Sequence, residues 1–238
     1  LAYLLVSLVD LSKKKKLLKV GKGTKGQQFA SYKVDFGSDA VEAGKTVQLE
    51  IEAVFTHLLN PYPDEIVQAD RQLVVYTGRV YFTTPYTTET QSTRVRLASN
   101  TGLESYTKVR PVATNDRFIN YGPYNNIAPT AESGLVKADE ELRVHAENNT
   151  PFLTVERLDR SIQVSHWAGA ISIEEVLDVV HTGGRLKGPF SRYEFQREPA
   201  SNGLPSVRGW KTRLPLGAQD IYYRDEIGNI STSNVRYT

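Results

Sequence analysis

The strongest constraint on the fold is a run in which every second residue is apolar. The apolar positions of this run are Val47, Leu49, Ile51, Ala53 and Phe55, and mostly Gln and Glu stand between them. Successive side chains of a β-strand point to opposite faces, so this pattern predicts a strand buried on one side. Alternating runs of this kind far outnumber helical ones along the 238 residues, which predicts a mostly β protein.

The same criterion places the other expected elements. Strand-like runs occur at Tyr3–Val9 (a buried strand or short helix), Gln28–Phe36, Gln72–Tyr76 and Arg79–Thr83 (a hairpin around Thr77-Gly78), Thr93–Leu97, Glu141–Ala146, Phe152–Val164, Ile171–Val180, Trp210–Leu216 and Ile221–Tyr223. One helical turn is expected from Pro63 to Ala69. Loops are expected at Gly21–Gly26, at the aperiodic residues 111–133, where Asn, Pro, Gly and Tyr abound, and at Glu198–Arg208.

A change of character at Pro151 suggests two domains, residues 1–150 and 151–238. A possible internal repeat supports this boundary, because the Tyr81–Val95 segment has a counterpart of similar composition at Tyr222–Val235. Chance similarity of strand-turn-strand units is the alternative explanation. The chain begins with Leu1 and contains no methionine, so we expect a fragment in which the start of the first domain and the end of the second are missing.

Composition narrows the functional classes. The net charge of +2 offers no basis for binding nucleic acid, which requires many clustered cations. The absence of cysteine excludes disulfides, cysteine-ligated zinc and thiol nucleophiles. No stretch approaches the ~20 apolar residues of a membrane-spanning helix, so any anchor would lie outside this sequence.

No catalytic constellation is recognisable, and we expect no catalytic, cofactor-binding or metal-binding residues. The four histidines (His57, His145, His166 and His181) lack metal-site spacing, and neither a P-loop nor a G-x-S-x-G motif occurs. The acidic residues at 139–141 and 174–175 are typical of a solvated surface. Asp225-Glu226 could bind a cation or pair with Arg224, but a polar turn closing on Gly228 explains the pair more simply.

Two Asn-x-Ser/Thr sequons are present, at Asn148-Asn149-Thr150 and Asn229-Ile230-Ser231. Such sequons are acceptors for N-linked glycans when they lie in surface segments. Pro151 directly follows the first sequon and is expected to hinder its modification. Asn229 follows a glycine in a polar turn and is the better candidate.

Several segments resemble the ribophorin I family. They are His57 with Asn60–Pro63, Glu104–Lys108, Tyr121–Pro123, Glu147–Phe152, Ser165-His166-Trp167, Leu186–Tyr193 and, as the most specific match, Gln219–Ser233. The matches run in order from about residue 45 to the end of the chain. The first forty residues match loosely, and the Lys13–Lys16 run replaces a more acidic loop.

The resemblance implies a non-catalytic subunit of the oligosaccharyltransferase complex, which transfers a lipid-linked oligosaccharide to Asn-x-Ser/Thr of nascent polypeptides. It implies location in the endoplasmic reticulum membrane through a transmembrane helix outside this sequence, with the present segment luminal. The expected partners are the other subunits, including the catalytic one, and nascent polypeptides. The expected fold is two consecutive β-sandwich-like domains similar to the N-terminal domain of leukotriene A4 hydrolase-type aminopeptidases.

Two other hypotheses remain open at this point. One is a stand-alone luminal module that binds peptide or glycan through loop tyrosines at Tyr121, Tyr124 and Tyr193. The other is a fragment of a metallopeptidase-related enzyme, which would require an HExxH helix elsewhere in the protein.

Overall fold

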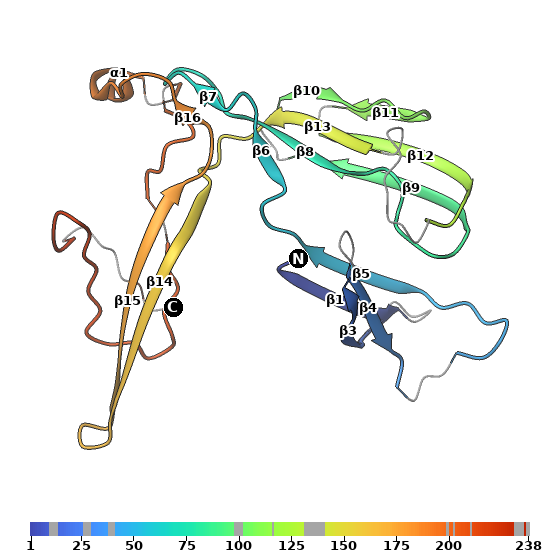
Figure 1. Ribbon diagram of the computed structural model, residues 1–238, viewed down its shortest axis with the longest axis horizontal. Coiled ribbons are helices and arrows are strands. Elements are labelled where there is room, and N and C mark those ends of the chain that lie inside the picture. The colour runs from blue at the N-terminus through green and yellow to red at the C-terminus, as the bar shows by residue number, and fades with distance from the viewer. Residues whose placement is uncertain are drawn as a thin grey trace. The chain divides into compact units, whose positions relative to one another are not determined.

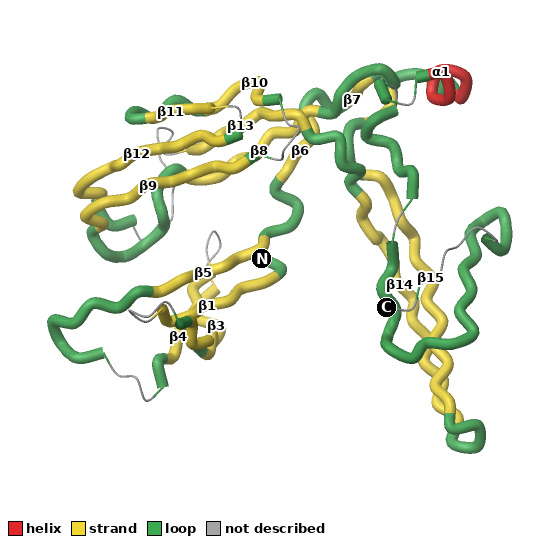
Figure 2. Tube along the Cα trace, turned by 180° about the vertical axis from the view of Figure 1, so that it is seen from behind, coloured by secondary structure: helices red, strands yellow, loops and turns green. Residues whose placement is uncertain are grey.

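The structure is a computed structural model that describes residues 1–9, 14–25, 30–37, 41–97, 102–115, 117–130, 141–198, 200–201, 203–209, 211–230 and 236. The chain forms two compact units, Leu1–Pro205 and Ser206–Thr238, and each is described by itself. Within the described ranges there are sixteen strands and one short helix (Figure 2). The prediction of a mostly β protein is confirmed.

A β-sandwich in the middle of the first unit contains the main hydrophobic core. One sheet has the order β10-β13-β8-β6, and the other has the order β11-β12-β9 (Figure 1). The strands of the first sheet are β6 (Leu59–Pro61), β8 (Leu73–Arg79), β10 (Leu103–Tyr106) and β13 (Glu141–Glu147); those of the second are β9 (Thr88–Arg96), β11 (Val112–Asn115) and β12 (Phe118–Ile127). All the strand pairs in these two sheets are antiparallel.

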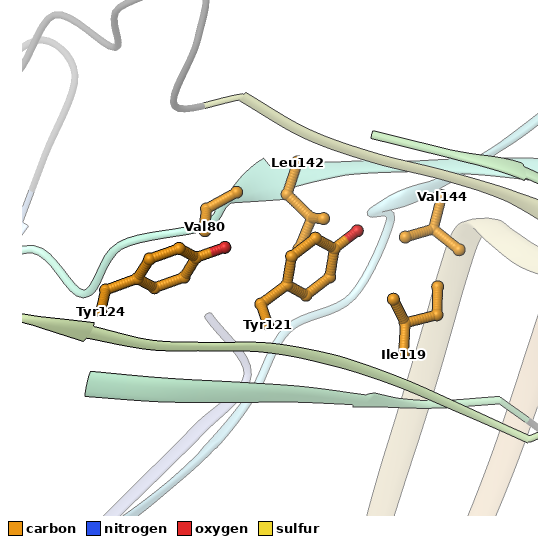
Figure 3. Close-up of a cluster of buried hydrophobic side chains, with 6 residues drawn as sticks. All are labelled: Val80, Ile119, Tyr121, Tyr124, Leu142 and Val144. Atoms are coloured by element: carbon orange, nitrogen blue, oxygen red, sulfur yellow. The ribbon is translucent and has the colours of Figure 1, made fainter. Parts of the chain in front are cut away.

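The facing side chains of the two sheets exclude water almost completely. Figure 3 shows the six buried residues of this core: Val80, Ile119, Tyr121, Tyr124, Leu142 and Val144. Ile119 is 0% exposed and Tyr121 is 1% exposed. Val95 and Leu97 pack against the cluster, as the alternation at Thr93–Leu97 predicts. Burial of aliphatic and aromatic side chains on this scale is the main force that stabilises a sandwich.

The prediction that residues 111–133 form a surface connection is wrong for the part that is described, residues 111–115 and 117–130. This stretch supplies β11 and β12, and three of the six core residues lie on β12. A register shift between Tyr121 and Tyr124, at Gly122-Pro123, accounts for the error. Such a β-bulge adds residues to one strand, so the period of two that would reveal the strand is interrupted.

The prediction of a hairpin turn at Thr77-Gly78 is also wrong, because β8 runs through both residues. Thr77 and Gly78 pair with Arg143 and Leu142 of β13. A Cβ atom at position 78 would overlap the ring of Tyr76. The glycine is therefore required by close packing within a strand and does not mark a turn.

The N-terminal part of the first unit forms two small sheets. The first, β2-β1-β5, contains β1 (Tyr3–Val9), β2 (Lys15–Leu17) and β5 (Leu49–Val54), and the second pairs β3 (Lys19–Lys25) with β4 (Ala30–Asp35). The strand predicted from Tyr3 to Val9 is confirmed as β1. The loop predicted at Gly21–Gly26 is wrong for its described residues, because residues 21–25 belong to β3, and Gly26 lies outside the described set. The strand expected around Val47–Phe55 is confirmed as β5. Its predicted burial is wrong, since every β5 side chain is exposed and Ile51 retains 51% of its accessible surface.

A long hairpin follows the sandwich. Its strands are β14 (Leu153–Ser165) and β15 (Ala170–His181), which confirms the runs predicted there. The first unit also contains a two-stranded parallel pair, β7 (Glu65–Ile66) with β16 (Arg185–Leu186). A strand thus replaces the helical turn predicted after Pro63. The one helix among the described residues, α1 (Arg192–Arg197), begins after Ser191, whose hydroxyl accepts a hydrogen bond from the Glu194 amide.

The second unit has little regular structure. Its described residues contain no strand, so the strands predicted at Trp210–Leu216 and Ile221–Tyr223 are not formed there, with Trp210 itself outside the described set. One isolated antiparallel bridge joins Arg224 to Asn229. Residues 231–235, which complete the possible repeat and the second sequon, also lie outside the described set.

Candidate functional site

Two segments that carry the family resemblance, Glu147–Phe152 and Leu186–Tyr193, are bonded in the first unit to two buried glutamines. A third such segment, Asn60–Pro63, is bonded instead to β8, where the Tyr62 amide donates to the Leu73 carbonyl. The glutamines, Gln68 and Gln72, lie on the chain between β7 and β8. Gln72 is 1% exposed and Gln68 is 8% exposed. We call this region the glutamine junction.

Gln72 fixes the first sequon to the base of the long hairpin. Its Nε2 donates to the carbonyl of Asn148 at 2.8 Å and to that of Thr150 at 3.3 Å. Its Oε1 accepts from the Gly184 amide at 2.8 Å. Both polar atoms of this side chain are therefore paired, as a buried amide requires.

The backbone of Gln72 contacts the same sequon. The Gln72 amide donates to Asn149 Oδ1 at 2.9 Å, and the Gln72 carbonyl accepts from the Asn148 amide at 2.9 Å. Asn148 Oδ1 accepts from the Thr150 amide at 3.0 Å and forms a local Asx-type turn. The Asn148 sequon thus has a fixed conformation that depends on Gln72.

Gln68 makes an equivalent contact with the segment that precedes α1. Its Nε2 donates to the Ser191 carbonyl at 2.9 Å, and its Oε1 accepts from the Ser191 amide at 2.7 Å. This pair of bonds reproduces the pairing of two strands with a side-chain amide in place of one peptide group. The Gln68 carbonyl also accepts from the Gly203 amide at 2.7 Å.

The short parallel ladder between β7 and β16 completes the junction. The Arg185 amide donates to the Asp64 carbonyl at 2.7 Å, and the Lys187 amide donates to the Ile66 carbonyl at 2.8 Å. A Cβ at position 183 would overlap Gln72 Oε1 and the His181 ring, so this position requires glycine. The arrangement positions backbone segments, and the two ring nitrogens of His181 beside it are both engaged with backbone groups, the Gly183 amide and the Pro205 carbonyl.

The four histidines differ in their surroundings. His145 Nε2 lies 3.0 Å from the Tyr62 carbonyl, and the two rings pack edge to face. His181 Nδ1 accepts from the Gly183 amide, and its Nε2 lies 2.9 Å from the Pro205 carbonyl, which fixes the tautomer with the proton on Nε2. His57 and His166 are exposed, and Trp167 beside His166 is fully exposed.

The turn predicted at Asp225-Glu226 is confirmed in the second unit. Asp225 Oδ1 accepts from the Ile227 amide at 2.8 Å and from the Gly228 amide at 3.1 Å. The Ile230 amide donates to the Tyr223 carbonyl at 3.0 Å and closes the turn. Asn229 is exposed at the end of this turn.

Two of the three tyrosines proposed for ligand binding are buried, so that prediction is wrong. The Tyr121 hydroxyl donates to the Thr107 carbonyl and the Tyr124 hydroxyl donates to the Val109 carbonyl, both at 2.8 Å. Burial, followed by the charges of Tyr106 and Tyr124, raises the pKa of Tyr121 to about 12, and burial likewise raises the pKa of Tyr124. Tyr193 is exposed, with the guanidinium of Arg197 over its ring.

The described residues offer few other candidate sites. No group of three or more His, Asp or Glu side chains could hold a metal ion in the part of the chain that is described. A shallow surface depression is lined by Tyr106, Lys108, Arg110, Pro111 and Val112. No helix among the described elements combines the length and apolar character needed to cross a bilayer.

Sequence reasoning missed the glutamine junction entirely. A buried glutamine in an irregular segment has no periodicity, so only the resemblance of the flanking segments pointed to this region. The paired glycines at 183 and 184 are the one local signal, because they allow the backbone to approach the Gln72 side chain closely.

Comparisons with known proteins give a consistent result. The family model described as Ribophorin I matches residues 1–238. Subunit 1 of dolichyl-diphosphooligosaccharide–protein glycosyltransferase from Caenorhabditis elegans is 41% identical over 228 residues, which is 96% of this chain and 37% of the relative. Subunits 1A and 1B from Arabidopsis thaliana are each 40% identical, over 81% and 86% of this chain and 30% and 42% of the relatives.

The chain therefore spans between about a third and two-fifths of the relatives' lengths. Identity of about 40% over most of the chain, together with the match of the family model to every residue, establishes the relationship. The chain belongs to the ribophorin I family.

Proposed function

We propose that the protein is a subunit of the oligosaccharyltransferase complex in the endoplasmic reticulum membrane, with this segment on the luminal side. The observation that carries the proposal is the 41% identity, over 96% of the chain, to a relative named as subunit 1 of that transferase. Its partners are then the other subunits, including the catalytic one, and the nascent polypeptides that receive the oligosaccharide.

Within this proposal the subunit is accessory and non-catalytic. In support, the histidines either hold backbone carbonyls or are exposed, and Asp225 caps a turn. The glutamine junction bonds residues 148–150, Gly184 and Ser191 through side-chain amides, which is a structural arrangement. We propose that the segment acts as a scaffold within the complex and needs no cofactor.

We further propose that residues 1–150 and 151–238 belong to two successive β domains resembling the N-terminal domain of leukotriene A4 hydrolase-type aminopeptidases. The position of the core supports the boundary, since its buried residues run from Val80 to Val144. The long hairpin begins at Leu153 and would belong to the second domain.

Asn229 is the glycan acceptor in this proposal, and Asn148 is not. Asn229 is exposed on a short turn where a glycan would extend into solvent. Both backbone groups of Asn148 are bonded to Gln72, and its side chain closes a turn. Acceptance of a glycan requires an accessible and adaptable sequon, so the glutamine junction opposes modification at Asn148.

Affinity purification of the full-length tagged protein from membranes in mild detergent tests the main proposal. Transferase activity toward an acceptor peptide is expected to co-purify with the tagged protein. Recovery of the tagged protein alone, without the catalytic subunit or transferase activity, would refute the proposal.

Substitution Asp225→Asn tests the non-catalytic role. Asparagine keeps the oxygen that caps the turn and removes the negative charge, so the fold is preserved while any acid-base role is lost. Transferase activity of the complex containing Asp225→Asn is expected to match the wild type. A large loss of activity with normal assembly would contradict an accessory role.

A further inference from the structure

A shallow depression lies beside the connection between the two sheets of the sandwich. β10 is an edge strand of one sheet and β11 is an edge strand of the other, and the two follow each other along one margin of the sandwich (Figure 1). The depression has a volume of about 600 Å³ and is lined by Tyr106, Lys108, Arg110, Pro111 and Val112. This volume lies within the range of ligand sites in proteins. We call it the basic depression, because both of its charged residues are cations.

The chain is extended where it lines the basic depression. Tyr106, Lys108 and Arg110 stand at alternate positions and line the same depression, as residues of an extended chain do when they share one face. Val109, which lies between the two cations, packs against the hydrophobic core instead. Lys108 and Arg110 therefore project from the same outer side of the connection.

Two tyrosines of the core fix this connection from the inside. The Tyr121 hydroxyl donates to the Thr107 carbonyl and the Tyr124 hydroxyl donates to the Val109 carbonyl, both at 2.8 Å. The backbone that presents the two cations is thus held by buried groups before any partner arrives. A site that is ordered in advance loses less entropy when it binds.

Neither cation of the basic depression has a carboxylate partner within the described part of the chain. Both side chains are exposed, and Lys108 Nζ lies 5.9 Å from the centroid of the Tyr106 ring. The described residues place no carboxylate within ion-pair distance of Lys108 or Arg110. On the adjacent strand β13, in contrast, Arg143 is paired with Glu141. The basic depression is therefore complementary to a ligand with negative charge.

The spacing of the cations fits an extended polypeptide better than a small anion. Small anions are bound by donors that converge on one point, often successive backbone amides, and Pro111 has no amide hydrogen to offer. Two positions along an extended chain separate Lys108 from Arg110, which corresponds to about 7 Å. Carboxylates at alternate positions of a second extended chain have the same spacing, so both cations can be met at once.

The strands beside the basic depression leave room for such a chain. Among the described strands, β10 is bonded only to β13 within its sheet, and β11 is bonded only to β12. Edge strands present backbone groups that an added extended segment can bond. An acidic segment can therefore bond to the backbone at this margin while its carboxylates face the cations.

We propose that the basic depression docks an extended acidic segment of another subunit, with carboxylates at alternate positions against Lys108 and Arg110. This partner rests on the proposed function, in which the chain is one subunit of a larger complex. Charge complementarity at a fixed site selects one defined sequence. Nascent polypeptides differ from one another in sequence, so they do not suit a site with this selectivity.

Zero-length crosslinking with a carbodiimide tests which group faces Lys108. The reagent joins an amine to a carboxylate that is in contact with it. The tagged full-length protein is purified with its complex, crosslinked, digested and analysed by mass spectrometry. A crosslink between Lys108 and an Asp or Glu of another subunit is expected. In Lys108→Arg, which keeps the charge and removes the amine, this crosslink is expected to disappear while the complex stays assembled.

The outcomes separate this inference from the proposed function. Transferase activity that fails to co-purify with the wild-type protein before crosslinking refutes the proposed function. When the activity does co-purify, a crosslink from Lys108 to the same chain, to a second copy or to a nascent polypeptide overturns the docking proposal alone. The absence of a Lys108 crosslink, in a complex whose other lysines are crosslinked, overturns it as well.

Removal of charge provides a second measurement with a matched control. The double variant Lys108→Gln with Arg110→Gln removes both cations of the basic depression. The double variant Arg94→Gln with Arg96→Gln removes two exposed cations with the same spacing on β9. Thermal unfolding midpoints, compared with the wild type, show that each variant is folded.

The rate at which the crosslinked subunit dissociates from the immobilised complex is then compared at one salt concentration. Dissociation is expected to be on the order of tenfold faster for the Lys108 and Arg110 variant, because two ion pairs are lost, and unchanged for the Arg94 and Arg96 variant. Equal dissociation rates for the two double variants would overturn the proposal.

Discussion

At the scale of single residues, buried polar groups explain much of what holds the described structure together. Tyr121 and Tyr124 place their rings in the core and their hydroxyls on the carbonyls of Thr107 and Val109. Each tyrosine therefore stabilises both the sandwich and the connection between β10 and β11. Gln72 likewise ties together two separate segments, residues 148–150 and the backbone at Gly184.

The raised pKa of Tyr121 predicts a loss of stability at alkaline pH. The unfolded phenol loses its proton near pH 10, whereas the folded one keeps its proton to about pH 12. Between these values the unfolded state binds fewer protons, so the free energy of unfolding falls as the pH rises. The stabilising contribution is fully present below about pH 10.

Urea unfolding of Tyr121→Phe as a function of pH measures this contribution. The variant is expected to be about 1 kcal/mol less stable at neutral pH, because the bond to Thr107 is lost. It is also expected to lose less stability than the wild type between about pH 10 and 12. Tyr86→Phe, at a residue that is 76% exposed, is the control. Identical alkaline slopes for wild type and Tyr121→Phe would contradict the assignment.

Gln72→Glu tests the glutamine junction. Glutamate has nearly the same shape but, when ionised, cannot donate to the carbonyls of Asn148 and Thr150. It would also bury an uncompensated charge, so a loss of about 3 kcal/mol or more is expected in the free energy of unfolding. Gln163→Glu, on the exposed hairpin, is expected to change stability by less than about 0.5 kcal/mol. Similar effects of the two substitutions would show that Gln72 is not a structural tie.

At the scale of secondary structure elements, prediction succeeded where a strand-like run was long. β14 and β15 were predicted to within one or two residues because strand-like residues continue for twelve or more positions, although a register shift interrupts β14 between Val155 and Arg157. β12 was missed because a bulge interrupts its pattern, and β8 was divided in two because a glycine suggested a turn. Tyr76 is only two residues from this glycine, but the position of its ring beside Gly78 depends on packing against the core, which the local sequence does not reveal.

Burial was harder to predict than strand formation. The alternation of β5 correctly indicated a strand, but its side chains are exposed. Whether an apolar face is covered depends on the presence of a facing layer, which a single strand's sequence does not encode. The glutamine junction was unpredictable for the same reason, since its partners lie more than seventy residues away along the chain.

The packing of β8 yields a prediction for Gly78. A methyl group at this position would overlap the Tyr76 ring, which itself packs against the core. Gly78→Ala is therefore expected to lower the free energy of unfolding by about 1–3 kcal/mol, as overpacked sites do. Gly209→Ala, where nothing lies within 4 Å of the added carbon, is the matched control and should be tolerated. Equal stability of the two variants in thermal unfolding would show that the ring can move aside freely.

At the scale of the whole molecule, the proposed location and the two sequons are linked. N-linked glycans are added only in the lumen, so a glycan on this segment reports its side of the membrane. The two sequons differ in structure: Asn229 is exposed on a short turn, and Asn148 is tied to Gln72 by both of its backbone polar groups. The molecule thus contains its own internal comparison between an accessible acceptor and a restrained one.

Expression of the full-length protein in eukaryotic cells, followed by glycosidase treatment and electrophoresis, tests this comparison. Asn229→Gln is expected to remove one glycan and to increase mobility by a single step, whereas Asn148→Gln is expected to leave mobility unchanged. Thr150→Ala provides a second test of the first sequon, because it removes the hydroxyl that the transferase requires and retains the amide that bonds to Asn148. A mobility step with Asn148→Gln or Thr150→Ala would show that the glutamine junction forms too late to protect this site. An unchanged mobility with Asn229→Gln, in protein shown by protease protection to be luminal, would exclude the turn at Asp225–Gly228 as the acceptor region.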